Sequence, residues 1–203
     1  MTKNNGEKKE KTHDPNFLIQ ELVDGGFEHI EEKIRQCANC SLYESSTNPV
    51  IMKGSHNPKV LFIGEAPGKT EDATGIPFSG RAGKKLDEMI GYMGLSVEDY
   101  AVINVLKCRP PNNRKPRKNE IEQCKPFLMA QIELLAPKVI ILLGNTAEEA
   151  FCDGKKKMKW GVPVVNDEGT NILKIYHPAA MIYQRSRVDE QKELIDKNSY
   201  LWE

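Results

Sequence analysis

The chain has 203 residues, and its 29 lysines and arginines balance its 29 aspartates and glutamates, so the formal net charge is zero at pH 7. This length suits one domain with its own core, and neither a membrane span nor a secretory signal is visible, which predicts a cytoplasmic protein. The zero net charge does not exclude a nucleic-acid partner, because such binding depends on local patches of charge.

The first segment is polar. Residues 1–14 are charged and lack apolar periodicity, which predicts a disordered tail before a single domain over residues 15–203. Apolar residues then recur at helical spacing and lead into Cys37. Gly25 and Gly26 predict a break that divides this helix into two pieces.

Four short apolar runs follow, and each ends at a turn signal. They cover residues 60–64, 101–106, 139–144 and 172–176. Helical patterns lie between them, one with Ser79 as its expected N-cap and one that begins near Asn119, with Glu122 three residues on. Alternating helices and strands that are apolar on both faces indicate an α/β protein with a buried parallel sheet. Ligands of such sheets bind beyond the carboxyl ends of the strands, where this sequence keeps its unusual residues.

Four of the five cysteines form two pairs. Cys37 and Cys40 form a CxxC motif that brings two thiolates to one metal centre, and Cys108 and Cys124 supply a second pair. The second pair is too wide for a zinc ribbon, and the CxxC follows a helix, unlike a thioredoxin-like motif. Spacing alone does not distinguish iron from zinc. Cys152 lies in an apolar helical pattern, and we expect it in the core.

The first strand ends in a glycine-rich turn at residues 64–68. Glycines allow a backbone to approach a ligand closely, although a simple tight turn is the alternative. The turn is not a phosphate-binding loop, since no Gly-Lys-Ser/Thr follows, and Pro67 interrupts any dinucleotide-binding pattern. In the continuing loop, Phe78 is an aromatic residue that either stacks on a base or anchors the next helix.

Two further strands end in polar side chains. Asn104 offers a donor and an acceptor that match the edge of a pyrimidine, or it satisfies a nearby loop as a structural amide. His177 follows the fourth run and is placed either to meet a ligand or to serve as a capping or core histidine. The segment 109–118 carries five cations and no anion, which suits phosphate contacts as well as exposure to solvent.

Together these motifs resemble the family-4 uracil-DNA glycosylases, from Cys37 to about Arg187. The motifs that carry the resemblance are Gly-Glu-Ala-Pro-Gly at 64–68, Gly-x-Pro-Phe at 75–78, Gly-Arg-Ala-Gly at 80–83, Asn-Val-Leu-Lys-Cys-Arg-Pro-Pro at 104–111 and His-Pro-Ala-Ala at 177–180. The resemblance implies a three-layer αβα sandwich around a four-stranded parallel sheet. It also implies a structural [4Fe-4S] cluster, whose ligands would be Cys37, Cys40, Cys108 and Cys124.

The activity that the resemblance implies is hydrolysis of the N-glycosidic bond of deoxyuridine, in single- or double-stranded DNA. The uracil must first leave the base stack, because its reacting bond is inaccessible in a duplex. By resemblance, Phe78 stacks on the uracil, Asn104 reads its N3–O4 edge and His177 donates toward O2. Asn104 and His177 are therefore two candidate catalytic residues.

The glycine-rich turn supplies the rest of the implied base site. Backbone groups of Gly64, Glu65 and Ala66 line the pocket, and Glu71 excludes the methyl group of thymine. Other glycosylase families place a water-positioning aspartate where Ala66 stands here. Either Glu65 helps here, which makes it the third candidate catalytic residue, or the bond breaks largely by dissociation with a poorly held water. No general base is assigned.

The resemblance also implies residues that touch the DNA. These are Arg109, Asn112, Arg114, Lys115, Arg117, Met181 and Arg185. An apolar residue after the His-Pro-Ala-Ala motif is expected to enter the space that the uracil leaves. In this stretch the sequence departs from the leucine and arginine of many relatives, and some 36 residues precede the first cysteine.

We expect a monomer that acts on uracil-containing DNA. A non-catalytic iron–sulfur module of the same fold that only binds nucleic acid is the alternative. A zinc or iron–sulfur electron-transfer protein is a third, which the wide separation of the cysteine pairs disfavours.

Overall fold

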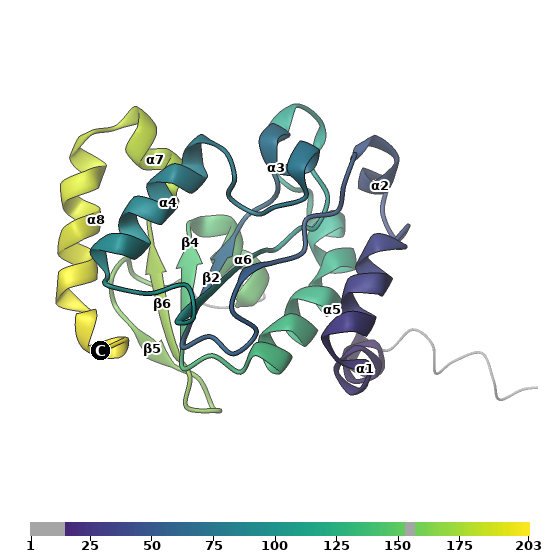
Figure 1. Ribbon diagram of the computed structural model, residues 1–203, viewed down its shortest axis with the longest axis horizontal. Helices are drawn as coiled ribbons and strands as arrows, with labels where there is room; N and C mark the ends of the chain where they lie inside the picture. The colour runs from purple at the N-terminus through teal and green to yellow at the C-terminus, as the bar shows by residue number, and fades with distance from the viewer. Residues whose placement is uncertain (1–14, 153–156) are drawn as a thin grey trace, which may run out of the picture.

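A six-stranded sheet lies at the centre of the described part of the protein, in the order β1-β3-β2-β4-β6-β5 (Figure 1). The structure is a computed structural model that describes residues 15–152 and 157–203. The strands are β1 (Lys53–Gly54), β2 (Val60–Gly64), β3 (Tyr100–Asn104), β4 (Val139–Leu143), β5 (Val164–Val165) and β6 (Asn171–Ile175). The tail predicted for residues 1–14 lies outside the described residues.

The four longer strands correspond to the four predicted runs. Strands β3, β2, β4 and β6 pair in parallel, which confirms the predicted parallel sheet. Strands β1 and β5 add an antiparallel edge on each side, which the sequence did not predict. Each has only two residues, too few to show a periodicity.

Helices cover both faces of the sheet (Figure 1). They are α1 (Pro15–Arg35), α2 (Leu42–Ser45), α3 (Lys69–Thr74), α4 (Arg81–Tyr92), α5 (Lys118–Leu135), α6 (Asn145–Phe151), α7 (Pro178–Tyr183) and α8 (Ser186–Lys197), with 3-10 turns η2 (Pro111–Asn113) and η3 (Ser199–Leu201). Along β2, Val60 and Phe62 pack toward α4, whereas Leu61 and Ile63 pack toward α5 and α6. The result is the predicted three-layer αβα sandwich. Within the described ranges, we find no helix that could span a bilayer.

Helix α1 lies outside the sandwich and packs on α5 through Leu22, Ile30 and Ile34. It kinks at Gly26, whose φ of 75° and ψ of −174° are not helical. This confirms the break predicted from the two glycines. The positive φ is a conformation that glycine adopts without steric cost.

Two helix starts differ by one residue from their prediction. Helix α4 has Gly80 as its N-cap, because the hydroxyl of Ser79 bonds Thr74 Oγ1 instead, at 2.8 Å. Helix α5 begins at Lys118, and the Glu120 carboxylate accepts from the backbone N–H of Arg117 at 2.8 Å. In both places a local hydrogen bond decides where the helix begins.

Candidate active site

A cavity of about 240 Å³ lies at the carboxyl-terminal edge of the parallel strands. Strand β2 ends at Gly64, β3 ends at Asn104, and His177 follows β6. Because these strands run parallel in one sheet, with β4 between β2 and β6, their carboxyl ends lie at the same edge (Figure 1). Six residues predicted for the base site line this cavity, namely Glu65, Ala66, Glu71, Phe78, Asn104 and His177.

Asn104 is the most unusual side chain of the cavity. It is 2% exposed, and its Oδ1 atom is buried without a hydrogen-bond partner. An unsatisfied buried acceptor costs about 1–3 kcal/mol, so its presence calls for an explanation. A Cβ atom on Gly64 would collide with this Oδ1 and lie 2.6 Å from Cζ of Phe78. Glycine at the end of β2 therefore leaves room for both side chains.

Phe78 is held in a strained backbone conformation. Its φ of 52° is rare for a bulky residue, and it is 6% exposed. Gly83 is required beside it, because a Cβ there would overlap the backbone carbonyl of Phe78. The ring packs in the core beneath α4 and also lines the cavity, so it combines the two alternatives considered from the sequence.

His177 lies next to the Phe78 ring, with 5.7 Å between the ring centroids. Its Nδ1 atom accepts a hydrogen bond from the backbone N–H of Ala179 at 3.2 Å. Burial lowers the pKa of His177 to about 4. The imidazole is therefore neutral at pH 7, and its one proton is on Nε2, because Nδ1 is the acceptor.

Two carboxylates in the cavity wall have different partners. Glu65 Oε2 accepts from the hydroxyl of Thr146 at 2.5 Å. Glu71 accepts from the backbone N–H of Gly68 at 3.1 Å and from that of Gly80 at 2.7 Å. Glu71 therefore ties the glycine-rich turn to the start of α4.

The basic segment after β3 contributes one cation to the cavity wall. The guanidinium of Arg114 donates two hydrogen bonds to the buried carboxylate of Glu120, at 2.8 and 2.6 Å. Asn113 lines the cavity beside it and accepts from Arg109 Nε at 2.7 Å. Arg114 and Asn113 thus belong to the cavity as well as to the loop.

The remaining residues predicted to touch DNA are spread over the adjoining surface. Asn112, Lys115 and Arg117 are exposed on the basic loop, and Lys115 pairs with Glu149 at 3.3 Å. Arg185 is exposed between α7 and α8.

Met181 differs from this group because it is 8% exposed. It packs in the core beside α4 and α8. On the same helix, Tyr183 is 79% exposed.

Sequence reasoning missed Asn113 and Thr146. Asn113 ends the 3-10 turn η2, whose three residues are too few to show a periodicity. Thr146 lies three residues after the end of β4 and inside helix α6. The rule that ligand-binding residues follow strand ends did not identify it, because this offset places it within a helical pattern.

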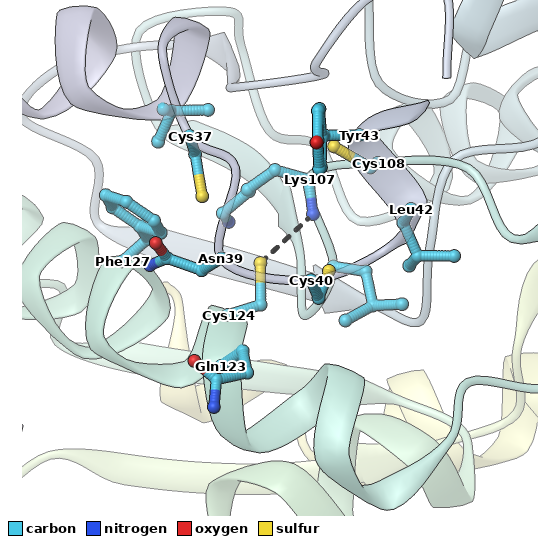
Figure 2. Close-up of a pocket in the computed structure, with 12 residues that line it drawn as sticks. Cys37, Asn39, Cys40, Leu42, Tyr43, Lys107, Cys108, Gln123, Cys124 and Phe127 are labelled. Atoms are coloured by element: carbon cyan, nitrogen blue, oxygen red, sulfur yellow. Dashed lines mark hydrogen bonds between the residues drawn. The ribbon is translucent and has the colours of Figure 1, made fainter. Parts of the chain in front are cut away.

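Four cysteines line a second cavity, and Figure 2 shows them gathered from separate segments. Cys37 and Cys40 follow α1, Cys108 follows β3, and Cys124 lies on α5. Burial raises the pKa of Cys108 to about 11 and that of Cys124 to about 12. Cys124 Sγ also accepts from the backbone N–H of Lys107 at 3.4 Å.

None of these described cysteines is in a disulfide. In residues 15–152 and 157–203, no three cysteine, histidine, aspartate or glutamate side chains meet closely enough to hold a single metal ion. Lys107 lines the four-cysteine cavity and Asn104 lines the base cavity. The two residues are linked, because the buried ammonium Nζ of Lys107 donates to the backbone carbonyl of Asn104 at 2.6 Å. Burial lowers the pKa of this lysine to about 8.

The fold and the cavity define an α/β protein with a partly polar pocket at the carboxyl edge of its parallel sheet. Residues 51–201 match the model of the uracil DNA glycosylase superfamily. The type-4 uracil-DNA glycosylase of Thermotoga maritima is 42% identical over 163 residues, which cover 78% of this chain and 84% of that protein. That of Archaeoglobus fulgidus is 39% identical over 179 residues, or 81% of this chain and 86% of its own.

The type-5 uracil-DNA glycosylase of Pyrobaculum aerophilum is less similar, with 26% identity over 81% of this chain and 87% of that protein. The chain therefore belongs to the uracil-DNA glycosylase superfamily and, within it, to the type-4 uracil-DNA glycosylases.

Proposed function

We propose that this protein is a DNA-repair enzyme that hydrolyses the N-glycosidic bond of uracil in DNA and leaves an abasic site. The observation that carries the proposal is the unpartnered, buried Oδ1 of Asn104 in a base-sized cavity. The N3–H group of a uracil in this cavity would supply the missing donor. The same side chain has an amide N–H to offer to O4 of the base, and this pairing matches uracil or thymine but not cytosine, whose N3 is an acceptor and whose 4-amino group is a donor.

The uracil enters the cavity after it has rotated out of the base stack, and Phe78 stacks on it. The C1′–N1 bond then breaks, and its electron pair leaves with the uracil. His177 donates its Nε2 proton in a hydrogen bond to O2, where the negative charge develops. A water oxygen bonds to C1′ and the base gains a proton, so the products are free uracil and an abasic sugar.

Thymine is excluded at the wall that carries Glu71. The backbone N–H groups of Gly68 and Gly80 donate to the Glu71 carboxylate and hold it in the cavity lining. A methyl group on C5 of the base would meet this fixed carboxylate and the turn at residues 64–68. Glu65 lies across the same turn, and we place it near the attacking water.

The four-cysteine cavity fits a [4Fe-4S] cluster. Its donor set is all thiol, and the thiols surround one cavity without meeting closely enough for a single ion. Cys37, Cys40, Cys108 and Cys124 would hold the cluster. When bound, it would supply iron–thiolate bonds that cross-link the end of α1, the loop after β3 and helix α5. This role is structural.

DNA passes over the surface next to the base cavity. We propose that Arg109, Asn112, Arg114, Lys115, Arg117 and Arg185 contact its phosphates. For the residue that fills the space left by uracil, the exposure of Tyr183 favours it over the buried Met181.

The test uses purified protein with its visible spectrum recorded, and labelled DNA that carries one uracil. Alkaline cleavage at uracil in single- and double-stranded DNA is expected, with none at thymine in the same position. Asn104→Ala should abolish most of the cleavage. Asn57→Ala is the matched control, because Asn57 is exposed and precedes the opposite end of β2.

Failure of the protein to cleave while its visible spectrum shows an intact cluster would overturn the proposal. If the same protein still bound DNA, it would be a non-catalytic binding module of this fold.

A further inference from the structure

We infer that Thr146 is a positioning residue for uracil release, because its hydroxyl holds the Glu65 carboxylate in the orientation that the attacking water needs. The inference rests on the proposed function and adds a residue to it. Thr146 is 4% exposed, so solvent cannot replace the carboxylate as partner of its hydroxyl.

The contact itself is short. Thr146 Oγ1 donates to Glu65 Oε2 at 2.5 Å, within the range of hydrogen bonds from a hydroxyl to a charged oxygen. Such bonds are roughly twice as strong as those between neutral groups. Strands β2 and β4 are parallel neighbours, which brings Glu65, just after β2, and Thr146, just after β4, to the same edge.

The main chain of Glu65 is already fixed. The N–H of Leu106 donates to the Glu65 carbonyl at 3.1 Å, and the N–H of Val105 donates to the Gly64 carbonyl at 2.9 Å. Only the side-chain torsions of Glu65 remain free, and these are what Thr146 restrains.

The second carboxylate oxygen of Glu65 is available to the reaction. Among the described residues, Thr146 provides the one hydrogen bond to this carboxylate, and Glu65 lines the base cavity. Oε1 can therefore accept a hydrogen bond from a water and leave a lone pair of that water directed at C1′. As the new C–O bond forms and uracil departs with the C1′–N1 electron pair, the spare water proton passes to solvent, and the uracil anion takes its proton from solvent.

The test compares Thr146→Val, which keeps the shape and loses the hydroxyl, with Thr146→Ser, which keeps the hydroxyl. Under single-turnover conditions with saturating enzyme, we expect the valine variant to release uracil about tenfold more slowly, as loss of one hydrogen bond to a charged group implies. The serine variant should restore the rate to within about threefold. Affinity for uracil-containing DNA should not change. Thr170→Val, in the β5–β6 turn, is the matched control.

A double-mutant cycle separates positioning from a structural role. If Thr146 acts only through Glu65, Thr146→Val should add no further loss in a Glu65→Ala background. A wild-type rate in Thr146→Val, an equal loss in both backgrounds, or no rescue by serine would overturn the inference. If Glu65→Ala is too slow to measure, the serine comparison decides. An inactive wild-type protein would instead refute the proposed function.

Discussion

The surroundings of His177 determine both its tautomer and its charge. The backbone N–H of Ala179 occupies the lone pair of Nδ1, and burial disfavours the charged imidazolium. What remains is a neutral ring with a single N–H on Nε2. A neutral donor fits a leaving group that gains negative charge only as the bond breaks, since the interaction is strongest in the transition state.

The first prediction removes that donor. His177→Ala should slow uracil release by about 100-fold or more, because one donor aimed at developing charge contributes that much. Single-turnover cleavage of uracil-containing DNA measures the rate. Iron content should match that of the wild type, since His177 does not line the four-cysteine cavity. An unchanged rate would contradict the proposed role of His177.

The second prediction concerns protonation. The pKa of His177 is lowered from 6.5 to about 4, so the folded protein takes up this proton only near pH 4, whereas the unfolded chain does so near pH 6.5. This histidine therefore does not affect stability above pH 6.5, and it lowers the free energy of unfolding progressively as pH falls toward 4. In an NMR titration the imidazole signal, identified by its loss in His177→Asn, should stay unchanged from pH 8 to 5. A midpoint near 6.5 would refute the burial argument.

For single residues, the sequence correctly predicted which polar side chains lie at the ends of the strands. Asn104 and His177 were recognisable because a polar residue at the end of an apolar run is unusual. Contacts between side chains that are distant in the local pattern were not recognisable. For example, Arg114 turns inward to Glu120 because the loop folds back on α5, and no pattern in residues 109–118 predicts that contact.

Among the elements, α6 and β6 are joined by a buried ion pair. Lys174 Nζ lies 2.6 Å from Glu148 Oε2, and both side chains are 5% exposed. The ammonium also lies 4.2 Å from the centre of the Trp160 ring. Burying two charges is costly, and the pair compensates for this only while both partners are present.

The third prediction follows from that cost. Lys174→Met should lower the free energy of unfolding by about 3–5 kcal/mol, because it leaves the Glu148 carboxylate buried without its cation. Lys174→Met combined with Glu148→Gln should recover part of the loss, since no charge then remains buried. Thermal unfolding of the two variants beside the wild type measures this. A double variant less stable than the single one would contradict this explanation, because the unpaired carboxylate would then not be the source of the loss.

The elements also show where sequence patterns stop being informative. The four parallel strands were predictable because five consecutive buried positions leave a continuous apolar run, as in β2 and β4. Strand β5 was not predictable from the sequence, since both of its valines are exposed and its strand conformation depends on pairing with β6. Its presence follows from the turn at Gly169, whose φ of 84° lets the chain reverse.

In the molecule as a whole, the two cavities share one loop. Strand β3 ends at the base cavity with Asn104, and the loop that follows passes Cys108 in the four-cysteine cavity, called the thiol cavity below. It then returns to the base cavity with Asn113. Cys37 and Cys40, which follow the peripheral helix α1, line the same cavity as Cys108 of this loop. The thiol cavity therefore lies where the peripheral helix meets the loop that shapes the active site.

The last prediction tests this arrangement by removing one thiol. Cys124→Ser should lower the iron content, and amide hydrogen exchange should become faster in α1 and in residues 109–118. The amides of β2 and β4 should keep their protection, because the sheet is buried independently of α1. Cys152→Ser is the matched control, since Cys152 does not line the thiol cavity. It should leave both the iron content and the exchange unchanged. Equal exchange in α1 with and without iron would show that apolar packing on α5 alone holds this helix, and the cluster would then need a role other than cross-linking.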